Sequence, residues 1–155
     1  MAFLGQGATG QLSAFGTSES QWEEIELTVD SGACDTVMPA HMCANIRIDP
    51  SDPNLHCTTF EVANGAFILN MGERRCSMMT EGSGVPKNIT FQIADVHKPL
   101  LSISRLADNG YICALGEKGG YLEDTKTGEK IPLHRRNNLY VMKVWVRHES
   151  GFARQ

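Results

Sequence analysis

The sequence predicts an all-β (mainly β) domain with one short helix. A length of 155 residues suits a single domain with a core of its own. Between residues 22 and 115, short runs of alternating apolar and polar residues are separated by Asn, Gly, Pro and Asp, which is typical of strands joined by tight turns. Residues 1–20 are rich in Gly, Ser and Ala and are expected to form a flexible arm. Residues 116–155 carry more charge and have hairpin signals of their own.

The first predicted strand ends at an acidic turn. Alternating apolar residues at 25–29 predict the strand, which delivers Asp30 onto a turn formed by Ser31 and Gly32. An ionised carboxylate that is buried without partners is costly, so an acid held in such a turn indicates a function. The tripeptide also has a purely structural explanation, because Asp and Ser bond their own backbone in ordinary turns and Gly accepts positive φ. The rest of the chain has to distinguish between the two.

The later strands are predicted from their apolar runs. They are expected at 36–38, 59–62, 67–69, 88–96, 99–103 and 111–115. The segment 49–54, with its two prolines, is expected to be a loop. Asn64 and Gly65, which both tolerate positive φ, are expected to form the tip of a hairpin. A helix is expected over 104–109, ended by Gly110.

The composition disfavours several classes of protein. A net charge of −4 with scattered basic residues argues against a nucleic-acid-binding surface. No apolar stretch is long enough to cross a membrane, and the first residues lack the basic and apolar regions of a signal peptide. The five cysteines are irregularly spaced, include no Cys-x-x-Cys pair of a zinc site, and fit reduced thiols. We therefore expect a cytoplasmic protein that binds neither a metal nor an organic cofactor.

Three segments of the chain resemble motifs of a known family in their sequence and in their order. They read LTVDSGACDTV at 27–37, VANGAFILNMG at 62–72 and KPLLSISRLADNGYICAL at 98–115. Together they resemble the catalytic strand-turn-strand, the flap hairpin and the closing strand-helix-strand of retropepsins, the single-motif aspartic proteases of retroviruses and retrotransposons. Residues 100–106, with Leu-Tyr at 139–140, are most similar to copia-type retrotransposon polyproteins, in which such a protease precedes the integrase.

The resemblance implies a retropepsin-like closed β-barrel of the acid-protease fold that is active only as a homodimer. Asp30 of each chain would join a catalytic dyad that shares one proton, because two carboxylates about 3 Å apart cannot both ionise. One carboxylate would act as the general base that activates a water, and the other as the general acid. Ser31, Gly32 and Ala33 would shape the catalytic turn.

The resemblance also implies a site for a polypeptide substrate. The flap, which would close over an extended peptide bound as an added strand, consists of Ala63, Asn64, Gly65 and Ala66. The candidate pocket residues are Met38, Leu101 and Ile103. The implied substrate is the polyprotein itself, processed in the cytoplasm or within virus-like particles, with no part for nucleic acid, a membrane or a cofactor.

Two regions depart from the retroviral pattern. Ser102 stands where retroviral members usually have glycine, which predicts altered packing beneath the catalytic turn. Residues 116–155 extend past the point where retroviral proteases end, and they are expected to belong to the segment that links protease and integrase. The run at 139–146 has more apolar side chains than a solvated linker needs, so we expect it to fold against the protease core.

Two alternatives to catalysis stay open at this point. A retropepsin-like fold that has lost catalysis could act as a dimerisation or peptide-binding module, although the intact turn at Asp30 counts against such decay. A protein–protein scaffold with an accidental Asp-Ser-Gly turn would require the two other matching segments to be coincidence.

Overall fold

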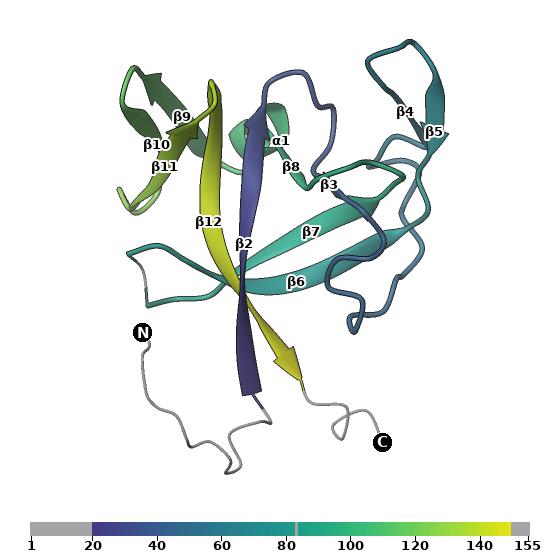
Figure 1. Ribbon diagram of the computed structural model, residues 1–155, viewed down its shortest axis with the longest axis horizontal. Coiled ribbons are helices and arrows are strands. Elements are labelled where there is room, and N and C mark those ends of the chain that lie inside the picture. Colours follow the sequence, from purple (N-terminus) through teal and green to yellow (C-terminus); the bar gives the residue numbers. More distant parts are fainter. Residues whose placement is uncertain (1–19, 83, 150–155) are drawn as a thin grey trace.

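The computed structural model describes residues 20–82 and 84–149, which form a mainly β structure with one short helix, as predicted (Figure 1). The strands of its large sheet are β2 (Ser20–Asp30), β3 (Val37–Met38), β6 (Glu73–Thr80), β7 (Lys87–Ile93), β8 (Leu100–Ser102), β9 (Tyr111–Gly116), β10 (Gly119–Asp124), β11 (Lys130–Arg136) and β12 (Leu139–Glu149). The other elements are a hairpin of β4 (Thr59–Glu61) and β5 (Phe67–Leu69) and the helix α1 (Ile103–Asp108). Apart from Ser20, the predicted arm over 1–20 lies outside the described residues.

Six of the strands close into a barrel. Their order around it is β2-β8-β3-β7-β6-β12, and β12 pairs with β2 to complete the circle. The antiparallel β2–β12 ladder runs from Thr28 opposite Val141 to Ser20 opposite Glu149. On its other side, β12 pairs with β6 through residues 144–146. Because each of these strands has two neighbours, the barrel satisfies the backbone groups that an open sheet would leave unpaired at its edges.

The strand that closes the barrel comes from the C-terminal segment. Residues 139–146 therefore fold against the core, as their apolar side chains predict. The boundary expected at residue 115 does not separate two sheets, because β12 pairs with β2 and β6 of the barrel. The physical reason is burial. Val144 and Val146 are 0% and 1% exposed, and burying side chains of this size stabilises the fold by about 1.5–3 kcal/mol each. That residues 116–155 belong to the segment linking protease and integrase stays a prediction.

Alternation along the strands builds the core inside the barrel. On β2, Ile25 and Leu27 are buried, whereas Glu24 is exposed and Glu26, between the two apolar residues, is half-buried. On β7, Phe91 and Ile93 are both fully buried in the same cluster. The predicted period of two for the first strand is therefore confirmed, and it sets which side chains face inward.

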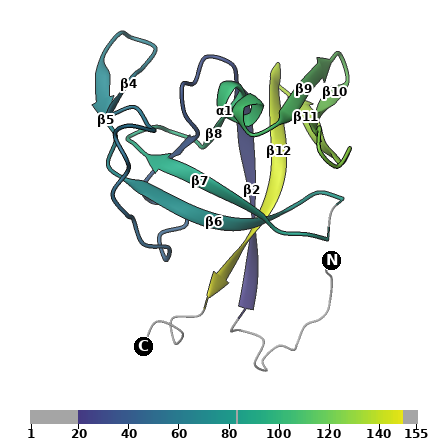
Figure 2. The same ribbon diagram turned by 180° about the vertical axis from the view of Figure 1, so that it is seen from behind.

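The sheet continues beyond the barrel, from β12 through β11 and β10 to β9 (Figure 2). Leu122, Ile131 and Leu133 of this extension are buried in the main core. The helix α1 follows β8 directly and ends before Gly110, which takes a φ of +87°. The helix predicted over 104–109 therefore exists and lies one residue earlier in the chain.

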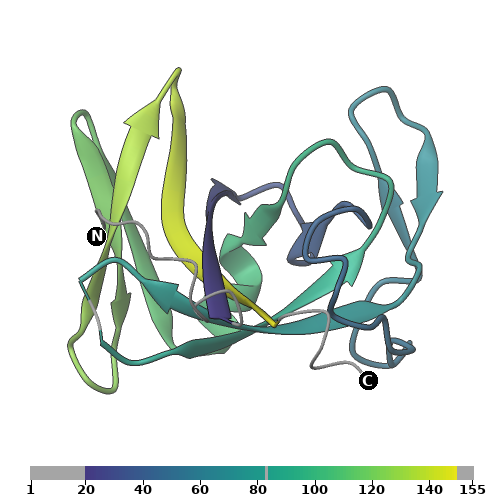
Figure 3. The same ribbon diagram turned by 60° about the horizontal axis from the view of Figure 1, so that its bottom comes forward.

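The hairpin β4–β5 is a separate small sheet that projects at the same end of the molecule as the turn after β2 (Figures 1 and 3). Its tip is the three-residue loop Ala63-Asn64-Gly65, closed by a hydrogen bond of 2.9 Å from the N–H of Val62 to the carbonyl of Ala66. Gly65 has a φ of +86°. Asn64 keeps a negative φ, and its side chain accepts a 2.9 Å bond from the N–H of Ala66. The hairpin is thus where it was predicted, but its turn uses positive φ at one residue rather than two.

Candidate active site

A cleft of about 930 Å³ lies between the turn after β2, the hairpin β4–β5 and the segment that joins β7 to β8. Its apolar lining comes from Val37, Phe60, Val62, Ile68, Val96 and Leu100. Its charged or titratable lining comes from Asp30, Asp35, Glu61, Asp95, His97 and Lys98, together with Cys34. A concave site with apolar walls and a few polar groups is typical of ligand-binding sites. The cleft therefore brings the predicted acidic turn and the predicted flap into one place.

Asp30 is the last residue of β2, and the turn that follows orients its carboxylate. The backbone N–H of Gly32 donates a hydrogen bond of 2.7 Å to Oδ1 of Asp30. An ideal Cβ on Gly32 would lie 3.3 Å from that oxygen, so glycine gives the backbone room for this close approach. Asp30, Gly32 and Ala33 line the cleft, whereas Ser31 is exposed and lies outside its lining. Asp30 itself is half-buried, so the carboxylate is held in orientation and stays accessible to solvent.

Ser102, at the end of β8, forms hydrogen bonds with the turn that follows Asp30. It lies opposite Asp30 in the parallel pairing of β2 with β8 and is fully buried. Its hydroxyl donates a 2.7 Å hydrogen bond to the carbonyl of Ala33, and its N–H donates a 3.1 Å bond to Oγ1 of Thr36. The serine that was expected to alter the packing beneath the turn therefore supplies two of the bonds that fix it.

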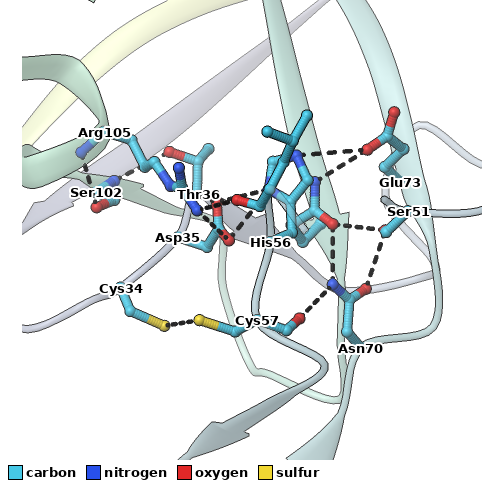
Figure 4. Close-up of polar contacts among 12 residues, drawn as sticks. Cys34, Asp35, Thr36, Ser51, His56, Cys57, Asn70, Glu73, Ser102 and Arg105 are labelled. Atoms are coloured by element: carbon cyan, nitrogen blue, oxygen red, sulfur yellow. Dashed lines mark hydrogen bonds and ion pairs between the residues drawn. The ribbon is translucent and has the colours of Figure 1, made fainter. Parts of the chain in front are cut away.

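Asp35, which is buried, anchors the other end of the turn through an ion pair with the half-buried Arg105 (Figure 4). The side chain of Asp35 is 3% exposed, and Arg105 of α1 places Nε 3.1 Å from Oδ1 and donates from Nη2 to Oδ2 at 3.2 Å. Nδ1 of His56 lies 3.2 Å from both carboxylate oxygens. Arg105 also donates to the carbonyl of Leu55 at 2.5 Å. These partners offset the desolvation of the carboxylate and join the turn to α1 and to the loop before β4.

The network continues from His56 toward the hairpin (Figure 4). Nε2 of His56 lies 3.8 Å from Oε1 of Glu73, which also accepts a 3.3 Å bond from Gln92. Nδ2 of Asn70 donates at 2.9 Å both to Oε1 of Gln92 and to the carbonyl of Cys57. Cys57 precedes β4 and Asn70 follows β5. Buried polar groups on the barrel thus hold both ends of the hairpin.

The predicted pocket residues lie elsewhere. Met38 and Leu101 are 0% and 1% exposed and belong to the core inside the barrel. Their neighbours Val37 and Leu100 pair with each other across β3 and β8 and line the cleft. Because alternate residues of a strand point to opposite faces, each predicted residue lies one position away from the residue that lines the cleft. Ile103 is half-buried at the start of α1 and is not part of the cleft lining.

The predicted flap residues are divided between the cleft and the solvent. Ala63 and Asn64 line the cleft, whereas Gly65 and Ala66 are exposed and lie outside its lining. The hairpin also carries Phe67, which is 67% exposed. Two of the four predicted flap residues therefore lie at the cleft, and the cleft side of the hairpin begins earlier, on β4, than the sequence indicated. The role of the hairpin as a flap stays a prediction.

Several residues of the site escaped the sequence analysis. The segment 95–98, which lines the cleft, had a usable signal, because three of its four residues (Asp95, His97 and Lys98) are polar and it directly follows a buried strand. Asp35 and Arg105 had a weaker one, since an acid and a base lie in two of the three matching segments. His56 had none, because only the folded chain brings it to Asp35.

Two classes of site find no support in the part of the chain that the structure describes. No group of three or more His, Cys, Asp and Glu side chains lies close enough together there to hold a metal ion. The one helix within 20–82 and 84–149, α1, is neither long nor apolar enough to cross a membrane. Comparisons of the chain with protein-family models, with curated proteins and with solved structures found no match.

Proposed function

We propose that this chain is an aspartic endopeptidase of the retropepsin type, active as a homodimer on a polyprotein. The observation that carries the proposal is the setting of Asp30. Its carboxylate accepts a 2.7 Å bond from the backbone of an Asp-Ser-Gly turn, and it faces a cleft with apolar walls beneath a hairpin. Aspartic peptidases need a carboxylate of fixed orientation beside a site that accepts an extended peptide.

A second copy of the chain supplies the other half of the chemistry. The turn presents one half-buried Asp30, and a two-fold axis beside it would bring two such carboxylates together. Two carboxylates about 3 Å apart share one proton and titrate as a unit. The ionised carboxylate removes a proton from a water, which attacks the peptide carbonyl, while the protonated carboxyl donates its proton to the carbonyl oxygen. Collapse of the tetrahedral intermediate then releases an amine and a carboxylic acid.

The cleft suggests how the substrate is held. Val37, Phe60 and Leu100 offer apolar surface to the side chains of a peptide, and the hairpin offers backbone groups to its main chain. Asp95, His97 and Lys98 add charge of both signs along one wall. These features favour an extended segment with apolar residues near the bond that is cleaved, such as those between the domains of a retrotransposon polyprotein in the cytoplasm or within virus-like particles.

The test is cleavage of a mixed peptide library, with the products identified by mass spectrometry. The wild-type chain is expected to cleave, and Asp30→Asn to lose activity by several orders of magnitude while staying folded. Asp108→Asn is the matched control, because Asp108 is an exposed residue at the end of α1 outside the cleft lining. A wild-type chain that binds library peptides without cleaving them, and binds them as Asp30→Asn does, would favour the peptide-binding module instead.

A further inference from the structure

Two cysteines from different segments bring their thiols into contact beside the cleft. Cys34 lies in the turn between β2 and β3, and Cys57 lies two residues before β4. Their Sγ atoms are 3.0 Å apart, although the residues are 23 positions apart in the chain (Figure 4). Cys34 is exposed and lines the cleft, and Cys57 is half-buried. A disulfide bond is about 2.05 Å long, so a movement of about 1 Å separates this contact from a covalent bond.

We propose that Cys34 and Cys57 form a redox-active dithiol that closes to an intramolecular disulfide and ties the start of the hairpin β4–β5 to the turn that carries Asp30. The oxidant is a small disulfide such as oxidised glutathione. Its S–S bond breaks as the protein S–S bond forms, the two thiol hydrogens end on two molecules of reduced glutathione, and the two protein sulfurs together lose two electrons.

Hydrogen bonds beside both cysteines fix the positions of their backbone segments. The carbonyl of Cys57 is fixed by a 2.9 Å bond from Asn70. The residues next to the two cysteines, Asp35 and His56, contact each other at 3.2 Å. Both backbone segments are therefore held in place on either side of the sulfur contact, which keeps the two thiols next to each other.

The ionisation of the Cys34 thiol makes its reaction with the oxidant depend on pH. Although Cys34 as a whole is exposed, partial desolvation of its thiol, the hydrogen bond with Cys57 and the negative charge of Asp35 raise the pKa of this thiol to about 11. Asp35 is itself in contact with Arg105 and His56, so these are the other charged or titratable groups that face the pair. The attacking species is the thiolate. Attack by the Cys34 thiolate is therefore slow near neutral pH and becomes faster as the pH rises.

The chain also contains an internal comparison. Cys43 and Cys76 share a side-chain hydrogen bond, but they are 4% and 1% exposed inside the core. A contact between thiols is thus present in both pairs, and only the pair at the cleft is open to a reagent. Cys113 on β9 is half-buried and lies outside the cleft lining, so Cys113→Ser serves as a control variant.

The disulfide has two consequences. It closes a loop of more than twenty residues, which is expected to raise the melting temperature of the folded chain by roughly 6–12 °C. It also restrains the base of the hairpin, so hydrogen exchange at the amides of 62–66 should slow. If the proposed peptidase function holds, on which this last point rests, the oxidised protein turns over peptide more slowly, and a reductant restores the rate.

The experiment incubates the full chain with oxidised glutathione at about pH 8, a compromise between thiolate content and protein stability. The cysteine thiols that remain free are then alkylated. The protein is digested without reduction, and the peptides are analysed by mass spectrometry. We expect one Cys34–Cys57 cross-linked peptide, unreacted Cys43 and Cys76, and the rise in melting temperature. Cys34→Ser and Cys57→Ser should abolish the cross-link and the rise, whereas Cys113→Ser should keep both.

Three results would overturn the proposal: Cys34 and Cys57 that remain alkylatable, separate glutathione adducts on the two residues, or disulfides between chains. None of these readouts requires peptidase activity. A chain that forms the cross-link but cleaves no peptide in either redox state would support the dithiol and overturn the proposed function alone. Equal peptide turnover in an active enzyme before and after cross-linking would overturn the restraint on the hairpin.

Discussion

Buried Asp35 and half-buried Arg105 form an ion pair across 70 positions of the chain, with Nε of Arg105 3.1 Å from Oδ1 of Asp35. The acid lies at the end of the turn that begins at Asp30, and the base lies on the only helix within the described residues. The pair therefore joins two segments that the sequence could identify only separately. Its position suggests that it keeps the turn in register with α1, so that the carboxylate of Asp30 keeps its orientation.

Substitution of Arg105 tests how much the ion pair contributes to stability. Arg105→Ala leaves the Asp35 carboxylate buried with His56 as its remaining side-chain partner, and we expect a loss of about 2–4 kcal/mol in unfolding free energy, reduced by the partial exposure of the arginine. Urea denaturation measures the loss. Arg147→Ala, at an exposed arginine of β12, should change stability by less than about 0.5 kcal/mol. Equal effects of the two substitutions would show that the ion pair has no special role.

The close approach at Gly32 gives a prediction on activity. A methyl group in Gly32→Ala would sit 3.3 Å from Oδ1 of Asp30, so the carboxylate should shift and kcat should fall by about ten-fold or more, equivalent to about 1.4 kcal/mol. Stability should change by less than about 1 kcal/mol because the residue is exposed. Gly84→Ala is the control, since an added Cβ there meets nothing within 4 Å. A fully active Gly32→Ala would contradict the importance of this contact.

The hairpin tip can be tested with two glycines that share the same strain. Gly65 and Gly128 have φ of +86° and +79°, and an added Cβ meets nothing within 4 Å at either position. Substitution by valine should cost each about 1–2 kcal/mol of stability. Only Gly65→Val should also raise KM, because Gly65 shapes the hairpin over the cleft and Gly128 lies between β10 and β11. Steady-state kinetics with equal KM for the two variants would argue against a flap.

The thiol of Cys34 predicts a pH dependence of stability under reducing conditions. Its pKa is raised to about 11 in the folded state by partial desolvation and by its contacts with Cys57 and Asp35. The folded chain therefore holds this proton to a higher pH than the unfolded chain, so the contribution is fully present below about pH 8.5 and is lost as the pH rises toward about 11. Urea midpoints measured across this range should fall more steeply for the wild type than for Cys34→Ser. Parallel curves would refute this source of stability.

The parts of the fold that follow from local patterns were predictable. The strand ending at Asp30, the hairpin at 64–65 and the helix near 104–108 each have their own turn or alternation signals. The closure of the barrel was not predictable, because β2 and β12 are far apart in the sequence and no local pattern indicates that they pair. The apolar run at 139–146 predicted burial but gave no partner.

The candidate site shows the same limit at finer scale. Asp30 could be identified because its turn has a recognisable sequence. The pocket residues could not, since β3 and β8 are only two and three residues long and too short to show which residues point inward. The choice between Met38 and Val37 depends on their pairing with β7 and β8, which only the assembled sheet determines.

The most direct measurement mixes wild-type chains with Asp30→Asn chains. If each active site is built from two Asp30 carboxylates, random pairing in an equimolar mixture at fixed total protein leaves about a quarter of the dimers with both acids. Peptidase activity should then fall to about a quarter of the wild-type value, because a dimer with one Asp30 has no carboxylate pair to share the proton. Activity that falls only to about half would mean that each chain works alone. Activity that does not fall at all would mean that Asp30 takes no part in the chemistry.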